Sequence, residues 1–205
     1  MDYVEPIQAL VPGVQGRVLA VLAATDAELT MRTVASLAGV SVNRAVAVLN
    51  HLVDLGVVVR REAGRAALVR LQADNEAARA IIALSRVHDR VVERLRHEAG
   101  TIRPAPAALV LFGSFATGSA RAGSDVDVLA VRPDEVTSDD PSWAAGLGSW
   151  SDAATRITGN PVSLVVVGEA EVPALRRRRG SLWRAIAEGG VLLAGSDLGR
   201  LGPAA

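Results

Sequence analysis

The sequence predicts a two-domain α/β (α+β) protein, with a helical N-terminal domain that ends in a β-hairpin and a C-terminal mixed sheet with flanking helices. Apolar residues recur at helical spacing between residues 14 and 55, and two strand-like runs follow. After residue 104, strand-like runs alternate with helical patterns. The 205 residues, 50% of them hydrophobic, suffice for two small cores. We expect domains over residues 1–73 and 104–205, joined by a linker helix within residues 74–103.

Composition narrows the class of protein. The formal net charge is zero, although all 22 basic residues are arginine, so global charge favours neither nucleic acid nor a membrane surface as a partner. The sequence has no cysteine, which excludes disulfides and thiolate metal sites. No run reaches the roughly 18 apolar residues of a membrane span, and the N-terminus lacks a signal-peptide pattern. The expected location is the cytoplasm, without a membrane partner.

Three helices are predicted before the hairpin, over Val14–Ala24, Met31–Ala38 and Val42–Leu55. Thr30 and Ser41 precede the second and third helices as capping residues, and a glycine lies between them. The apolar face of the third helix comprises Val42, Val46, Leu49 and Val53. Two helices joined by a short turn that contains glycine are the helix-turn-helix signature.

The runs Val57–Arg61 and Ala67–Leu71, separated by a polar turn over residues 62–65, predict the two strands of a hairpin. Helices and hairpin together resemble the winged helix-turn-helix domains of bacterial regulators of the ArsR and MarR type. The resemblance implies DNA as a partner, contacted by the third helix and by arginines of the hairpin, or wing. The candidate DNA-binding residues are Asn43, Arg44, Arg60, Arg61 and Arg65. The alternative is a winged helix used only for dimerisation or protein contact.

Residues Glu76–Ala99 have apolar side chains along one face and charged side chains on the other, which predicts one long amphipathic helix. This helix would join the two domains and could pair with a second copy of itself in a homodimer. His88 and His97 lie on it without a metal-binding spacing, and we interpret them as surface residues.

The clearest chemical pattern lies in Leu109–Val131. This stretch reads as an apolar strand, the pair Gly113-Ser114, a helix start near residue 115 and a second strand carrying Asp125 and Asp127. Residues two apart on a strand share a face, so both carboxylates should project together. A hard divalent cation such as Mg²⁺ would relieve their repulsion and keep positions for substrate phosphates. The glycine-serine turn predicts the phosphate contact.

Residues Phe112–Leu129 resemble the signature of the nucleotidyltransferase superfamily that includes DNA polymerase beta, especially its minimal prokaryotic branch, in which a Gly-Ser pair precedes Ser-Asp-x-Asp. The resemblance extends over about residues 107–195. It implies transfer of a nucleoside monophosphate from a nucleoside triphosphate to a hydroxyl of a protein, RNA or small molecule. The implied nucleotide-binding residues are Gly113, Ser114 and Ser124. The implied catalytic ligands of Mg²⁺ or Mn²⁺ are Asp125 and Asp127.

Two positions depart from the family pattern. The strand Pro161–Val167 carries Ser163 where the third carboxylate of the family is expected, and Thr117 stands where many minimal members have arginine. One alternative is therefore a transcriptional regulator whose C-terminal domain has lost catalysis and acts as a nucleotide sensor or dimerisation unit. Another is the antidote-like role that minimal members play beside helical RNase toxins.

The remaining elements complete the C-terminal domain. Asp140-Pro141 is typical of a helix start, and the spacing that follows predicts a buried stripe. The stripe comprises Trp143, Leu147, Trp150, Ala154 and Ile157. One helix is expected over residues 173–190, with Arg176–Arg179 either solvated or offering charge to a triphosphate, RNA or a partner. A final strand is expected at Val191–Leu193.

Overall fold

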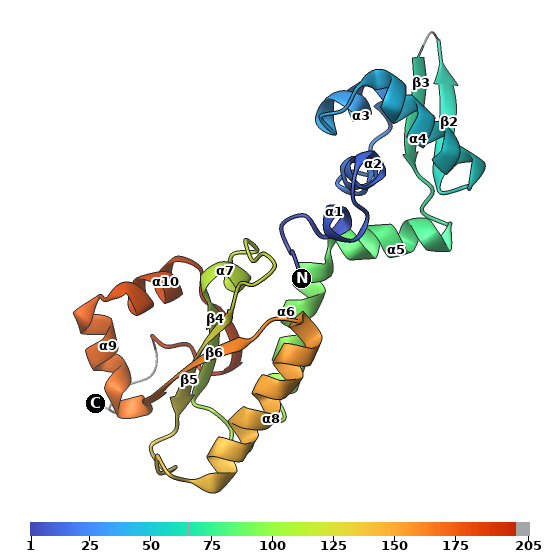
Figure 1. The fold of residues 1–205 in the computed structure, drawn as a ribbon. Helices are drawn as coiled ribbons and strands as arrows, with labels where there is room; N and C mark the ends of the chain where they lie inside the picture. The colour runs from blue at the N-terminus through green and yellow to red at the C-terminus, as the bar shows by residue number, and fades with distance from the viewer. Residues whose placement is uncertain (65, 200–205) are drawn as a thin grey trace. The chain divides into compact units, whose positions relative to one another are not determined.

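The computed structural model describes residues 1–64 and 66–199 (Figure 1). Their contacts define two compact units. The first comprises residues 4–87 together with Asp2, and the second comprises Met1, Tyr3 and the residues from His88 onward. The residues expected to form a linker, 74–103, are divided between these units. Each unit contains helices and a sheet, which confirms the predicted α/β class.

The first unit has the element order of a winged helix. Its helices are α1 (Pro6–Leu10), α2 (Val14–Ala23), α3 (Met31–Leu37), α4 (Val42–Asp54) and α5 (Glu76–Ser85), and its strands are β1 (Leu29–Thr30), β2 (Val58–Ala63) and β3 (Ala66–Leu71). The strands form an antiparallel sheet in the order β1-β3-β2. Fully buried side chains of α2, α3, α4 and β3 form its core, among them Val18, Val34, Leu49 and Val69.

Capping and burial in the α3–α4 pair follow the prediction in part. The Thr30 hydroxyl accepts a hydrogen bond from the Thr33 N–H at 3.0 Å and so caps α3. Ser41 occupies the N-cap position of α4, but its side chain makes no capping hydrogen bond. The predicted apolar face of α4 is wrong at Val42, which is 43% exposed. The buried residues of α4 are Ala45, Leu49 and Leu52, a stripe at steps of four and three.

The hairpin is longer and its turn tighter than predicted. Glu62, expected in the turn, belongs to β2 and pairs with Ala67, and Ala63 pairs with Ala66. Gly64 follows with a φ of +63°, a left-handed conformation that glycine adopts without steric cost. Arg65 lies outside the described residues.

The single helix predicted over Glu76–Ala99 is wrong. The structure has α5 and a separate α6 (Val87–Ala99), because the backbone of Arg86 leaves the helical region at φ −105° and ψ 20°. The apolar residues of α5 pack in the core of the first unit, whereas Val91, Val92 and Leu95 of α6 are buried in the second. A continuous amphipathic pattern does not reveal that its two halves serve different cores.

The second unit is built on a four-stranded mixed sheet, as predicted. After α6 follow β4 (Ala108–Phe112), α7 (Gly113–Ala116), β5 (Val126–Arg132), α8 (Pro141–Thr158), β6 (Val162–Gly168), the 3₁₀ turn η1 (Glu169–Glu171), α9 (Val172–Arg178), α10 (Ser181–Gly189) and β7 (Val191–Gly195). The strand order is β6-β5-β4-β7, with β5 and β6 parallel and β4 antiparallel to both of its neighbours (Figure 1).

Helices cover this sheet on both faces. On one face, alternate residues of β4 and β5 pack with Val172 and Ile186 from α9 and α10. α8 and α6 pack together, and the Trp150 indole donates a hydrogen bond to the Leu95 carbonyl at 3.3 Å. The predicted stripe of α8 is buried, with Ile157 half-buried at its end, so its tryptophans are core residues. Gly146 is needed on this helix because a Cβ there would lie 2.8 Å from the Arg103 carbonyl oxygen.

The single helix predicted over residues 173–190 is also wrong. Arg179 takes a left-handed conformation at φ +46°, and Gly180 is extended, so the chain leaves α9 and starts α10 again at Ser181. In the described part of the chain, no single helix is long and apolar enough to cross a membrane. The sharply bent pair α3 and α4 meets that test only on length and composition.

Candidate metal and nucleotide site

No loop separates β4 from α7, because β4 ends at Phe112 and α7 begins at the next residue. Phe112 is extended at the N-cap position, and Gly113 is the first residue of α7, two residues earlier than predicted. Gly113 has a φ of +69°, which glycine adopts far more readily than any other residue. The conformation brings the chain directly from a buried strand into a half-buried Gly113-Ser114 turn.

Asp127 lies against this turn. In the antiparallel pairing of β4 with β5, Phe112 is opposite Asp127. The Asp127 side chain is therefore next to the residue that follows Phe112, and a Cβ placed on Gly113 would be 2.6 Å from Asp127 Oδ2. Since Cβ atoms are not tolerated at that distance, the missing side chain of Gly113 provides room for the carboxylate. The predicted phosphate turn and one predicted metal ligand thus meet in space.

Asp125 directly precedes β5 and is exposed, and the turn before it is held by an asparagine that sequence reasoning missed. Asn160 is only 1% exposed. Its side-chain amide donates to the Ser124 carbonyl at 2.7 Å and to the Arg121 carbonyl at 3.4 Å. The Ser124 hydroxyl accepts from the Arg121 N–H at 3.0 Å, so its first role is to close this turn. Asn160 and Ser124 together fix the approach of the chain to Asp125.

Ser163 lies beside Asp127 because the two residues are paired in the parallel register of β5 and β6. Burial raises the pKa of the Asp127 carboxyl, the negative charge of Asp125 raises it further, and a hydrogen bond from Ser163 acts in the opposite direction. A serine that donates to a carboxylate stabilises its charged form, but it adds no negative charge to a cation site. The position next to Asp127 is therefore polar without being acidic.

These residues offer a small donor set for a metal ion. Within residues 1–64 and 66–199, no group of three or more His, Cys, Asp or Glu side chains is arranged to hold a cation. Asp125 and Asp127 supply carboxylate oxygens only. That set fits Mg²⁺, which is commonly bound through one or two carboxylates while waters and substrate phosphates complete its octahedron.

Thr117 closes the other end of α7. Its hydroxyl lies 3.3 Å from the carbonyls of both Gly113 and Ser114 and 2.8 Å from the Ser119 hydroxyl. The arginine that the resemblance implies at this position would place a charged group on an exposed turn. Threonine instead satisfies backbone carbonyls of the single helical turn, which stabilises it locally.

The four consecutive arginines Arg176–Arg179, at the end of α9, are all exposed. The Arg176 guanidinium contacts its own unit: it lies over the Trp183 ring, 5.9 Å from the centroid, and donates to the Gly199 carbonyl at 3.4 Å. The prediction that one arginine of this run points toward the domain is confirmed for Arg176.

The candidate DNA-binding residues of the first unit differ in whether their side chains form ion pairs. Asn43 and Arg44 are exposed on α4, as predicted. Arg60 forms an ion pair with Glu62 at 2.7 Å, and Arg61 forms one with Glu28. The positive charge that the sequence predicts for the arginines of the wing is therefore partly neutralised by acids of the same unit. Glu28 is distant in sequence, and only the pairing of β1 with β3 brings it near the wing.

A comparison with models of known protein families finds a match, which lies within the second unit. Residues 88–179, less than half of the chain, match the family model of the nucleotidyltransferase domain. The match begins at His88, the residue at which the continuous segment of the second compact unit begins. It includes Gly113, Ser114 and both aspartates, so the resemblance expected from the sequence is borne out at the level of the domain.

Two solved structures are similar to this chain, both with TM-scores below 0.5. A MarR family transcriptional regulator from Silicibacter pomeroyi DSS-3 is 27% identical, with a TM-score of 0.33 over 48% of this chain and 74% of that chain. TrmBL2, an archaeal chromatin protein described as having a novel mode of DNA binding, is 16% identical, with a TM-score of 0.31 over 90% of this chain and 77% of that chain. No curated protein matches.

Proposed function

We propose that the second unit binds a nucleoside triphosphate with Mg²⁺ and transfers its nucleoside monophosphate to a hydroxyl acceptor. The observation that carries this proposal is the contact between Gly113 and Asp127, which puts a side-chain-free backbone turn against a carboxylate. The phosphates would lie at Gly113-Ser114, and Asp125 and Asp127 would hold the cation. Mn²⁺ would satisfy the same oxygen ligands.

Each residue would have a distinct task in this reaction. The bound cation would supply positive charge to stabilise the pyrophosphate leaving group and the attacking oxygen. The missing side chain of Gly113 would let the turn that holds the phosphates lie directly beside the Asp127 carboxylate. Ser163 would keep Asp127 charged and oriented through its hydrogen bond. Asn160 would hold the Arg121–Ser124 turn, and with it the position of Asp125.

A transfer assay tests this function. The purified protein is incubated with each nucleoside triphosphate, labelled at the α-phosphate, with Mg²⁺ and with RNA, protein or small-molecule acceptors from a cell extract. The proposal requires label to enter an acceptor and pyrophosphate to be released by the wild type and not by Asp127→Asn. Equal turnover by the two proteins would eliminate the assignment of Asp127.

A second function is favoured by one observation: Ser163 lies beside Asp127 in the strand pairing, and the described residues place no group of three acids or histidines there. In this reading the second unit is a nucleotide sensor or a dimerisation unit of a transcriptional regulator, and transfer has been lost. Binding of the nucleotide would survive, because Asp125, Asp127 and the Gly113-Ser114 turn remain.

The variant Ser163→Asp separates the two functions. A third carboxylate beside Asp127 is expected to lower stability without metal, through repulsion, and to increase affinity for Mg²⁺. If the wild type is a sensor, transfer of label is expected to arise only in Ser163→Asp; if the wild type is a transferase, it transfers label itself. Ser163→Ala is the matched control, and gain of Mg²⁺ affinity in both variants would contradict the explanation by charge.

We also propose that the first unit binds duplex DNA through α4 and the wing. Arg44→Ala is expected to weaken binding across DNA sequences and to reduce the salt dependence of log K by about one charge equivalent, since one phosphate contact is lost. Glu28→Gln is expected to strengthen binding, because it releases Arg61 from its ion pair. Fluorescence anisotropy with labelled duplex DNA at several salt concentrations measures both. Unchanged binding in both variants would reject Arg44 and Arg61 as contacts to DNA, and no binding of duplex DNA by wild type would favour a winged helix that contacts protein only.

A further inference from the structure

The carbonyl groups of the single turn α7 accept hydrogen bonds mainly from residues that lie outside this helix. A helix of four residues forms almost no internal backbone hydrogen bonds, so its carbonyls need other partners. The carbonyls of Gly113 and Ser114 receive the Thr117 hydroxyl, and Ser114 also receives the Ser119 N–H at 2.8 Å. These partners all come from the same loop.

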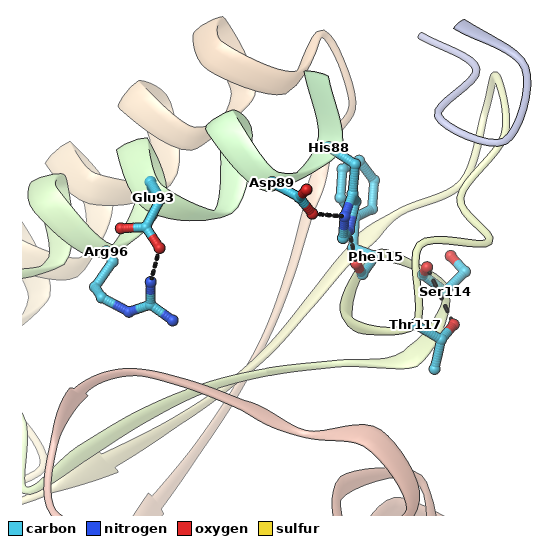
Figure 2. A network of polar contacts seen from close by, with 7 residues as sticks. All are labelled: His88, Asp89, Glu93, Arg96, Ser114, Phe115 and Thr117. Carbon is cyan, nitrogen blue, oxygen red and sulfur yellow. Dashed lines mark hydrogen bonds and ion pairs between the residues drawn. The ribbon is translucent and has the colours of Figure 1, made fainter. Parts of the chain in front are cut away.

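The Phe115 carbonyl has a partner from elsewhere in the sequence. His88, in the first turn of α6, approaches it through Nε2 at 2.6 Å, and Figure 2 shows the imidazole directed at Phe115. The Gly118 N–H is also near this oxygen, at 3.4 Å, but a bond of that length is weak. The carbonyl oxygen can only accept, so His88 donates the Nε2 proton. His88 was interpreted from the sequence as a surface residue, and that interpretation is wrong.

The imidazole is itself held in place. Its side chain is 22% exposed, and Nδ1 lies 3.4 Å from an Asp89 carboxylate oxygen (Figure 2). A Cβ at Gly118 would be 3.7 Å from the ring, an ordinary van der Waals contact. Tyr3 packs its ring 5.0 Å from that of Phe115 and edge-on to His88, and its N–H donates to the Ala120 carbonyl at 2.9 Å.

We infer that His88 is a positioning residue for the nucleotide-binding turn, acting through the Phe115 carbonyl, and this inference rests on the proposed function. Phe115 is fully buried, so a hydrogen bond to its carbonyl fixes α7 relative to α6. Gly113 and Ser114 begin the same turn and are held by it in one conformation. Without the His88 donor, part of the binding energy of a nucleotide would be spent on ordering the turn.

Two variants separate the donor from the ring. His88→Gln keeps a side-chain N–H donor and removes the ring, whereas His88→Phe keeps an aromatic ring of similar shape and cannot donate. His97→Ala, an exposed histidine of the same helix, is the matched control. Thermal denaturation of each variant of the 205-residue chain confirms that it is folded before titration.

The test is calorimetric titration of each protein with Mg²⁺ and the nucleoside triphosphate that wild type binds, together with amide hydrogen exchange over residues 114–120. We expect affinity in the order wild type, His88→Gln, His88→Phe, with His88→Phe weaker by about three- to ten-fold and His97→Ala unchanged. Exchange of the turn in nucleotide-free protein should be fastest in His88→Phe.

Different outcomes overturn different claims. Equal affinities for all variants, in a wild type that binds nucleotide, would reject the role of His88 and leave the proposed function intact. A reversed order, with His88→Phe like wild type and His88→Gln weak, would show that the ring acts by packing and would also reject it. If wild type binds no nucleoside triphosphate, the proposed function itself is wrong, and the role of His88 falls with it.

Discussion

Asp127→Asn is expected to abolish Mg²⁺-dependent nucleotide binding and, without metal, to raise the melting temperature at neutral pH. The two effects share a cause, because the Asp127 carboxylate is partly buried beside a second carboxylate. Burial and the charge of Asp125 raise its pKa, which means that folding disfavours its ionised form. The proposed cation ligand Asp127 is therefore expected to lower the stability of the metal-free fold at neutral pH.

The pH dependence has a definite sign. A carboxyl whose pKa is raised by folding contributes stability below its unfolded pKa of about 3.9, and this contribution is lost as pH rises through the raised value. Asparagine does not ionise, so the advantage of Asp127→Asn should be present at pH 7 and shrink toward pH 4. Thermal denaturation at both pH values measures this difference.

Added MgCl₂ completes the experiment. Mg²⁺ is expected to stabilise wild type at pH 7 and to leave Asp127→Asn unchanged, because the variant lacks one of the two anionic ligands. Asp152→Asn, a change at an exposed aspartate of α8, is the matched control and should respond to Mg²⁺ like wild type. If Mg²⁺ stabilises Asp127→Asn as much as wild type, the cation is bound elsewhere.

Gly113→Ala is expected to give the second large effect. The φ of +69° costs a residue with a Cβ about 1–2 kcal/mol. In addition, the new Cβ would be 2.6 Å from Asp127 Oδ2, so either the carboxylate or the turn must move. We therefore expect lower stability and at least a ten-fold loss of nucleotide affinity, measured by denaturant unfolding and by calorimetric titration.

A second glycine provides the control for strain. Gly159 also has a left-handed conformation, at φ +71°, but a Cβ there meets no atom within 4 Å. Gly159→Ala should thus show the loss of stability due to φ alone and keep wild-type nucleotide affinity. A Gly113→Ala protein that binds nucleotide as tightly as Gly159→Ala would mean that the space beside Asp127 is not where phosphate lies.

Local patterns predicted much of the fold and part of the site. The buried apolar strands β4 and β5, the Asp140 cap of α8 and the buried tryptophans follow from residues close in sequence. The proximity of Gly113 and Asp127 was also predictable, since a glycine at the end of one strand and an aspartate near the start of the next meet in an antiparallel pair.

The errors have a common physical origin in contacts between distant segments. The helix break at Arg86 depends on which core each half packs against, and the break at Arg179 depends on one left-handed residue. An amphipathic pattern in the sequence indicates neither of these. The hydrogen bonds made by the side chains of His88 and Asn160, and the one between Arg61 and Glu28, join residues that are 27 to 39 positions apart in the sequence. Histidine, asparagine, glutamate and arginine are all common on protein surfaces. The sequence therefore does not show which of them bind each other, and only the folded structure does.

The central claim is that the Gly113-Ser114 turn and the two aspartates form one site for a metal-bound nucleotide. Calorimetric titration of ATP, GTP, CTP and UTP, with and without Mg²⁺, into wild type and into the Asp125→Ala, Asp127→Ala double variant tests it most directly. We predict that wild type binds at least one of them, that binding requires Mg²⁺, and that the double variant, although folded, does not bind. Binding that persists in the double variant, or no binding by wild type, would contradict the claim.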